Sequence, residues 1–137
     1  MDHTINNLVR IEKEIQLKIP KSKTNPVIVA VSKTFPMTDI LPLINHGHIH
    51  FGENKIQEAV EKWTDIKNDF PHIQLHMIGK LQTNKVKYVI PLFDYIHSLD
   101  NLKLAEKISN EQLKIDKKIK IFIQINFDNE IQKSGIN

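Results

Sequence analysis

Residues 26–33, with the sequence PVIVAVSK, decide the fold, because five consecutive apolar residues follow a proline and lead into a polar turn. Continuous apolar runs of this length are typical of strands in parallel sheets, which are buried on both faces. We therefore expect a buried strand over residues 27–31. The carboxyl end of this strand would carry Ser32 and Lys33 into the following loop.

Apolar residues on both sides of this strand change to helical spacing. Those before it are Ile5, Leu8, Ile11 and Ile15. They predict a helix that stops before Pro20, since proline cannot continue the helical hydrogen-bond ladder. After the strand, Thr38 is expected to cap a helix that tolerates Pro42 in its first turn and ends at Gly47.

The same alternation continues to the end of the chain. Further strand-like runs are residues 49–51, 73–78, 95–99 and 119–127, and runs at helical spacing are residues 56–66, 86–90 and 104–115. We expect Pro91 to stop the second of these helices and Asp100 to cap the third. Strands that alternate with helices predict an α/β fold with about five parallel strands.

Right-handed crossovers leave two arrangements for such a sheet, a closed barrel of the TIM type or a doubly wound open sheet. The pattern of apolar residues does not choose between them. In both arrangements, ligands bind at the carboxyl ends of the strands, where the strand-to-helix loops gather.

The composition is that of one globular domain spanning residues 1–137, with 40% hydrophobic and 26% charged residues. The net charge of +3 does not indicate a nucleic-acid partner, because the lysines are interleaved with acidic residues. No apolar run is long enough to cross a membrane, and residues 1–4 lack the order of a secretion signal. Since the chain has no cysteine, a disulfide framework is excluded and a cytoplasmic location is expected.

Polar residues follow each predicted strand, and these clusters would converge on one end of the sheet. They are SKT at residues 32–34, FGEN at 51–54, HMIG at 76–79, HSLD at 97–100 and QIN at 124–126. Each cluster alone is compatible with ordinary loop chemistry. Their convergence favours a ligand site.

Lys33 is the sharpest candidate in these clusters. A lysine directly after five apolar residues is expected to lie beside a low-dielectric core, where its pKa falls because the ammonium form is disfavoured. The neutral amine is the form that attacks an aldehyde, so the position suits carbonyl chemistry. The alternative is a lysine that extends from the strand end into solvent, and the residues alone leave both interpretations open.

Histidines allow two further interpretations. His46, His48 and His50 alternate as metal ligands can on one strand, but Gly47 is expected to end a helix between them. No carboxylate completes the set, so we expect no metal site. His76 is either a residue of a ligand pocket or a core histidine with satisfied hydrogen bonds.

Other prominent side chains have structural interpretations. Trp63 shares the apolar face of the helix over residues 56–66, so we expect it in the core. Glu53 and Glu58 are expected to be exposed acids near the first turn of that helix, where they interact favourably with its dipole. The helix that begins after Gln82 could offer its amide groups to an anion.

A series of short motifs carries a resemblance to a known family. They are VAVSKT at residues 29–34, FGENKIQE at 51–58, HMIGKLQTNK at 76–85, QIN at 124–126 and KSGI at 133–136. In their order and spacing they resemble the YggS/PROSC type of pyridoxal phosphate homeostasis protein. The resemblance extends from about residue 27 to the end of the chain.

The resemblance implies a partial TIM-type barrel similar to the N-terminal domain of alanine racemase. Lys33 would hold the cofactor, pyridoxal 5′-phosphate (PLP), as a Schiff base, and an incoming amine would release it by transimination. The other residues that the resemblance places at the cofactor pocket are Asn54, His76, Ser98, Asn126 and, near the entrance, Lys133. The implied function is vitamin B6 homeostasis without enzymatic turnover. Amino acids or PLP-dependent apo-enzymes would be partners, and full-length family members would be monomers.

The length of the chain differs from a complete barrel, which needs roughly 250 residues. We therefore expect the C-terminal part of the domain, with strands six to eight and the phosphate-binding cup, to be absent. Two alternatives to the carrier function stay open. The first is a racemase-like PLP enzyme, although the second acid–base group that racemisation requires is not visible. The second is a truncated remnant that binds no cofactor.

Overall fold

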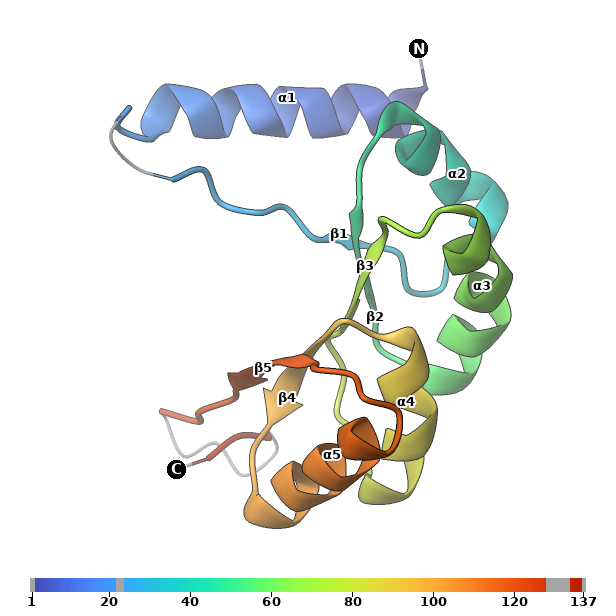
Figure 1. The fold of residues 1–137 in the computed structure, drawn as a ribbon. Helices are drawn as coiled ribbons and strands as arrows, with labels where there is room; N and C mark the ends of the chain where they lie inside the picture. The colour runs from blue at the N-terminus through green and yellow to red at the C-terminus, as the bar shows by residue number, and fades with distance from the viewer. Residues whose placement is uncertain (1, 22–23, 128–133, 137) are drawn as a thin grey trace.

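The computed structural model describes residues 2–21, 24–127 and 134–136, which form a single layer of parallel strands with helices packed against it (Figure 1). In chain order the elements are α1 (His3–Lys18), β1 (Ala30–Val31), α2 (Met37–His46), β2 (His50–Glu53), α3 (Ile56–Asp69), β3 (Gln74–Met77), η1 (Thr83–Lys85), α4 (Val86–Leu92), β4 (Tyr95–Leu99), α5 (Leu102–Lys114) and β5 (Lys120–Ile123).

The five strands are all parallel and lie in the order β1-β2-β3-β4-β5. A doubly wound sheet reverses direction at a switch point and places helices on both faces, whereas a barrel adds each strand beside the previous one. Figure 1 shows α2, α3, α4 and α5 along the same side of the strands. The prediction of an α/β fold that is part of a TIM-type barrel is thus confirmed.

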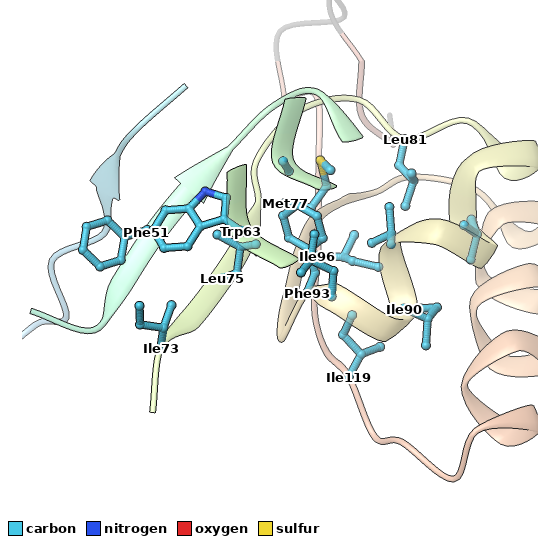
Figure 2. Packing of buried hydrophobic residues seen from close by; sticks show 14 of the residues in the cluster. Phe51, Trp63, Ile73, Leu75, Met77, Leu81, Ile90, Phe93, Ile96 and Ile119 are labelled. Carbon is cyan, nitrogen blue, oxygen red and sulfur yellow. The ribbon is translucent and has the colours of Figure 1, made fainter. Parts of the chain in front are cut away.

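The hydrophobic core fills the space between the helices and the sheet (Figure 2). Its largest fully buried side chains come from strands and helices alike, and they include Phe51, Trp63, Leu75, Met77, Ile90, Phe93 and Ile96. The rings of Phe51 and Trp63 lie 5.1 Å apart between β2 and α3. The expectation that Trp63 is a core residue is confirmed.

Side chains on the opposite face of the strands form a second, more polar layer. Because side chains alternate along a strand, the neighbours of the core residues point to this inner face, which would line the interior of a barrel. Its aromatic and charged members are His50, His76, Tyr95, His97, Lys120 and Phe122, which contact one another across four strands.

The expected buried strand over residues 27–31 is wrong in two respects. Only Ala30–Val31 pair as a strand, and 62% of Val27 and 51% of Val31 are exposed. The physical reason is position: β1 pairs with β2 alone among the described strands. A strand at the edge of a sheet lacks the second neighbour that buries the strands of a complete parallel sheet.

The last strand is also shorter than the predicted range of residues 119–127. β5 ends at Ile123, and beyond it Ile125 forms an isolated parallel bridge with Ile136. Ile119 is buried, whereas Phe127 is 86% exposed. The alternation of apolar residues predicted a strand here but not its extent, because pairing depends on the neighbouring chain.

Helix ends differ from the predictions where backbone geometry selects another cap. α2 begins after Pro36 instead of Thr38, so Pro42 lies within the helix beyond its first turn. Gly47 ends α2 with a left-handed φ of 107°, as predicted.

Pro91 does not stop α4 but lies inside it, near its end. The side chain of Asn101, not that of Asp100, caps α5 by accepting a hydrogen bond from the backbone of Leu104 at 2.8 Å.

The N-terminal helix α1 is only partly packed. Leu8 is buried and Ile5 packs against the core, but 42% of Ile11 is exposed. Figure 1 shows the second half of α1 extending away from the strands. None of the helices in the described ranges has the length and apolar content needed to cross a bilayer.

Candidate functional site

The carboxyl ends of β1 and β2 bring two of the predicted site residues together. Val31 pairs with Gly52, and Lys33 and Asn54 each follow two residues later, in the loops at the carboxyl ends of these neighbouring strands. The Lys33 side chain is exposed, and within the described residues it forms no hydrogen bond or ion pair. The amine is therefore accessible at the edge where parallel α/β proteins bind ligands.

The two residues that flank Lys33 are both held by polar contacts. Ser32 is buried, and its hydroxyl donates to Oε2 of Glu53 at 2.5 Å. The backbone N–H of Thr34 donates to Oε1 of Glu58 at 2.6 Å. Thr34 has a left-handed φ of 69°, which is unusual for a β-branched residue. The loop around Lys33 is thus fixed on both sides.

Glu53 is fully buried, contrary to the expectation of an exposed acid. Besides the hydroxyl of Ser32, its Oε2 accepts a hydrogen bond from Nε1 of Trp63 at 3.0 Å and lies 2.9 Å from Nζ of Lys62. A buried carboxylate needs such partners, because moving a charged group out of water without them is strongly unfavourable. The signal was present in the sequence: Glu53 lies two residues after Phe51, so alternation places both side chains on the helix-facing side.

Glu58 and Lys62 complete this network from α3. The side chain of Glu58 is partly exposed and lies 3.9 Å from Nζ of Lys62, one helical turn away. Lys62 also donates to the backbone carbonyl of Ser32 at 2.7 Å. The expectation that Glu58 is simply an exposed first-turn acid is wrong, since its carboxylate binds the loop that carries Lys33.

Asn54 is held by close packing between two strand-to-helix loops. A Cβ atom added to Gly79 would lie 2.4 Å from the carbonyl oxygen of Asn54, which only glycine permits. The side-chain Oδ1 of Asn54 is buried and has no hydrogen-bond partner among the described residues. An unpaired buried oxygen at the carboxyl edge can accept a hydrogen bond from a ligand.

His76 lies within the inner layer, on β3. The register places it level with Val31, two residues before Lys33. Its Nε2 is 3.0 Å from Nδ1 of His50, and its Nδ1 is 2.8 Å from Nε2 of His97. Its ring stacks on Tyr95 with centroids 4.1 Å apart. Both ring nitrogens are therefore hydrogen-bonded, as expected of a satisfied core histidine.

Burial is the main influence on the pKa values of these three linked histidines, His50, His76 and His97. It lowers the pKa of His76 to about 4, with further lowering from His97 and His50. The pKa values of His50 and His97 are lowered as well, in both cases mainly by burial. At neutral pH the three rings are uncharged, so each ring can donate through one nitrogen and accept through the other.

His97 is a residue that the sequence interpretation did not select. Met77 pairs with Ile96, so the next residue, His97, lies beside Ile78 and at the level of Asn54 and Lys33. Its inward direction follows from its alternation with the buried Ile96. Of the three linked histidines, His97 lies nearest to the carboxyl ends of the strands.

Ser98 lies at an irregularity in the pairing of β4 with β5, between Ile96 and Leu99. Its hydroxyl is buried and has no hydrogen-bond partner among the described residues. Bulges of this kind re-aim side chains next to functional sites.

Asn126 and the KSG motif meet at the end of β5. The N–H of Asn126 donates to the carbonyl of Ile136 at 2.6 Å, and Gly135 has a φ of 127°. The N–H of Gly135 also donates to the carboxylate of Asp100 at 3.2 Å. The QIN and KSG motifs are thus in contact, while Lys133 lies outside the described residues.

A cavity of about 330 Å³ lies beside Asn54, between the loops that follow β2 and β3. Its lining includes three lysines, Lys55, Lys80 and Lys85. Gln82 precedes only the three-residue η1 and the seven-residue α4, so the expected anion site at a helix start lacks a long helix. Within the described ranges, no group of three histidine, aspartate or glutamate side chains is arranged to hold a metal ion.

The residues of the carboxyl edge fit an aldehyde-bearing cofactor with polar substituents. An exposed amine on a fixed loop can condense with an aldehyde. The unpaired oxygens of Asn54 and Ser98 are hydrogen-bonding groups without a protein partner. The nearby lysines supply positive charge for an anionic group.

Known proteins similar in sequence were found along almost the whole chain, although no protein-family model matches it. The pyridoxal phosphate homeostasis protein of Pasteurella multocida is 37% identical over 133 residues, covering 95% of this chain and 57% of its own length. The corresponding proteins of Haemophilus influenzae and Escherichia coli are 36% and 32% identical. The chain spans 55% and 60% of these two relatives.

Solved structures give the same result. PipY of Synechococcus elongatus, solved without PLP, is 32% identical with a TM-score of 0.78 and covers 91% of this chain and 56% of its own. PipY solved with PLP bound has a TM-score of 0.75. An unknown protein from Bifidobacterium adolescentis is 27% identical with a TM-score of 0.78. The resemblance to the YggS/PROSC type of protein is confirmed.

Proposed function

The chain is related in sequence and fold to the pyridoxal phosphate homeostasis proteins, and on this premise we propose that it binds PLP through Lys33 and serves vitamin B6 homeostasis. The observation that carries the proposal is the position of Lys33. Its exposed amine lies at the carboxyl edge of the sheet, on a loop fixed by Glu53 and Glu58.

The chemistry that PLP supplies when bound is an aldehyde next to a pyridine ring and a phosphate. The uncharged amine of Lys33 attacks the aldehyde carbon, and a C=N bond forms with loss of one water molecule. An incoming amine, such as that of an amino acid, would form a new C=N bond to the same carbon while the bond to Lys33 breaks and the lysine amine takes up the proton. The released cofactor would then pass to an apo-enzyme.

The remaining pocket residues have proposed roles that follow from where they lie. Asn54 and Ser98 present buried oxygens without protein partners, so they are suited to hydrogen-bond the cofactor. His76 and Asn126 would support the inner wall and the far rim, because each is held by neighbouring strands. Lys133 is proposed at the entrance on the strength of the family motif alone.

A carrier function is proposed in preference to racemisation, in keeping with the names of the relatives. Racemisation needs proton donors on both faces of the cofactor. The linked histidines lie on one wall, and burial keeps them uncharged at neutral pH. A cytoplasmic location belongs to the same proposal, since PLP-dependent apo-enzymes would be the acceptors.

Reductive trapping tests the proposal. The purified chain is mixed with PLP, reduced with borohydride and digested, and the adduct on each lysine is measured by mass spectrometry. We expect Lys33 to be modified at least about tenfold more than other lysines, because its exposed amine lies at the carboxyl edge on a loop held by Glu53 and Glu58. Lys33→Ala should abolish the yellow colour, and Lys13→Ala, which removes an exposed lysine of α1 far from this edge in the sequence, should leave it unchanged.

Adducts distributed evenly over the exposed lysines would refute the proposal and leave the remnant without cofactor as the better interpretation. An assay for D-amino acids on the loaded protein separates the carrier from an enzyme. Accumulation of the D-isomer at a rate that depends on Lys33 would favour the racemase alternative.

A further inference from the structure

The segment that carries Lys33 contains two unusual contacts that strand pairing does not require. Ser32 is tied to a fully buried glutamate, and Thr34 holds a left-handed conformation while donating to a second glutamate. Both glutamates come from the next strand and helix, β2 and α3. A conformational outlier next to a functional group is a reason to ask what the conformation serves.

We propose that Glu53 and Glu58 are positioning residues that fix the backbone on either side of Lys33 and thereby direct its amine. The inference rests on the proposed function of Lys33 and extends it to residues that do not touch the cofactor. Since the Lys33 side chain itself forms no hydrogen bond or ion pair within the described residues, the backbone of its loop determines where the side chain begins. Glu53 holds the residue before it and Glu58 the residue after it.

Lys62 couples the two holding points. Its Nζ lies 2.9 Å from Glu53, 3.9 Å from Glu58 and 2.7 Å from the backbone carbonyl of Ser32. One ammonium group therefore joins both carboxylates to the loop. Buried ion pairs contribute little net stability compared with apolar side chains of the same size, and their best-attested use is to specify one arrangement. This arrangement specifies where the loop lies.

Substitution of Glu58 gives the cleanest test, because this side chain is partly exposed and its loss leaves no buried charge. Glu58→Met keeps the length and volume of the side chain but removes the acceptor for Thr34. Glu58→Gln removes the charge and keeps an acceptor oxygen. Glu61→Met, at an exposed position of the same helix, is the matched control. Glu53→Gln is a fourth variant, whose folding is checked by circular dichroism.

Two measurements are made on each variant. The first is the PLP concentration that half-saturates the reduced adduct on Lys33, and the second is the hydrogen-exchange rate of the Thr34 amide by NMR. For Glu58→Met we expect the half-saturating concentration to rise about tenfold and exchange to accelerate about tenfold, as loss of one charge-assisted hydrogen bond predicts. Glu58→Gln should restore the concentration to within about threefold of the wild type, and Glu61→Met should change neither quantity by more than about twofold.

The outcomes separate the two levels of the argument. If the wild type shows no preference for Lys33, the proposed function fails and the positioning inference fails with it. If the wild type is modified at Lys33 and Glu58→Met is modified at the same PLP concentration, only the positioning inference is overturned. Faster Thr34 exchange without a change in Lys33 loading would also overturn it, because the contact would then be structural alone.

Discussion

The carbonyl oxygen of Asn54 occupies the space where a side chain on Gly79 would begin, 2.4 Å from the ideal position of a Cβ atom. This relationship brings the loop after β2 against the loop after β3, at the carboxyl edge where the candidate site lies. Both partners are backbone or near-backbone atoms, so neither can move aside by a change of rotamer.

Gly79→Ala should therefore destabilise the protein by about 3 kcal/mol, at the upper end of the range for overpacking. Gly52→Ala is the matched control, because its Cβ would meet only the side-chain tips of Ile78 and Val29 at 3.2 Å. We expect this control to lose about 1 kcal/mol. Urea unfolding at pH 7 measures both, and equal losses would contradict the prediction.

The inner histidines should make stability depend on pH in a defined window. The pKa of His76 is about 4 in the folded protein, below the ordinary value of 6.5 in the unfolded chain. Between these values the unfolded chain binds more protons, so stability rises with pH. The contribution of His76 is complete above pH 6.5 and is lost as the pH falls toward 4.

His76→Gln should flatten the stability profile in this window, because one titrating group contributes up to about 1.4 kcal/mol per pH unit. Urea midpoints are measured at half-unit intervals of pH. His72→Gln, at an exposed turn position, is the control and should keep the wild-type slope. A His76→Gln profile parallel to that of the wild type would show that another group causes the dependence.

The backbone at Thr34 permits a test of stored strain. A β-branched residue with a φ of 69° is destabilised by about 1–2 kcal/mol, and glycine removes this strain at the price of unfolded-state entropy. We expect Thr34→Gly to be stabilising by about 0.5 kcal/mol. Asp116→Gly, at a φ of 52°, should gain less because aspartate tolerates this region. Thermal unfolding compares the two, and a marked loss for Thr34→Gly alone would refute the argument.

Periodicity was sufficient to predict the fold class from the sequence. Helical and strand-like spacing alternated at the right places, and the motifs at residues 51–54 and 97–100 lie at the carboxyl ends of strands as expected. The strand order was not predictable from pattern, because a barrel and a doubly wound sheet use the same units. The burial of β1 was overestimated, since burial depends on neighbouring strands and not on the apolar run itself.

The sequence predicted the residues proposed to bind the cofactor, but not the buried residues that hold the Lys33 loop. Lys33 and Asn54 lie on the loops that follow two neighbouring parallel strands, as the strand-to-helix pattern predicted. Glu53 was misinterpreted because a glutamate before a helix is usually exposed, whereas here alternation along β2 turns it toward Trp63. The ion pair with Lys62 spans two elements, and a contact of that kind has no signature in local sequence.

Lys117 donates hydrogen bonds to carbonyl groups at the C-terminal end of α4. The last carbonyl groups of a helix have no N–H of the same helix to accept from, so those at the end of α4 need donors from elsewhere. Lys117 supplies them, since its Nζ lies 2.6 Å from the carbonyl oxygen of Ile90 and 2.7 Å from that of Phe93. Loss of these hydrogen bonds in Lys117→Met should destabilise the protein by about 2 kcal/mol. Lys118→Met removes the exposed neighbouring lysine and should change stability by less than about 0.5 kcal/mol, and equal urea midpoints for the two variants would show that water replaces the lysine.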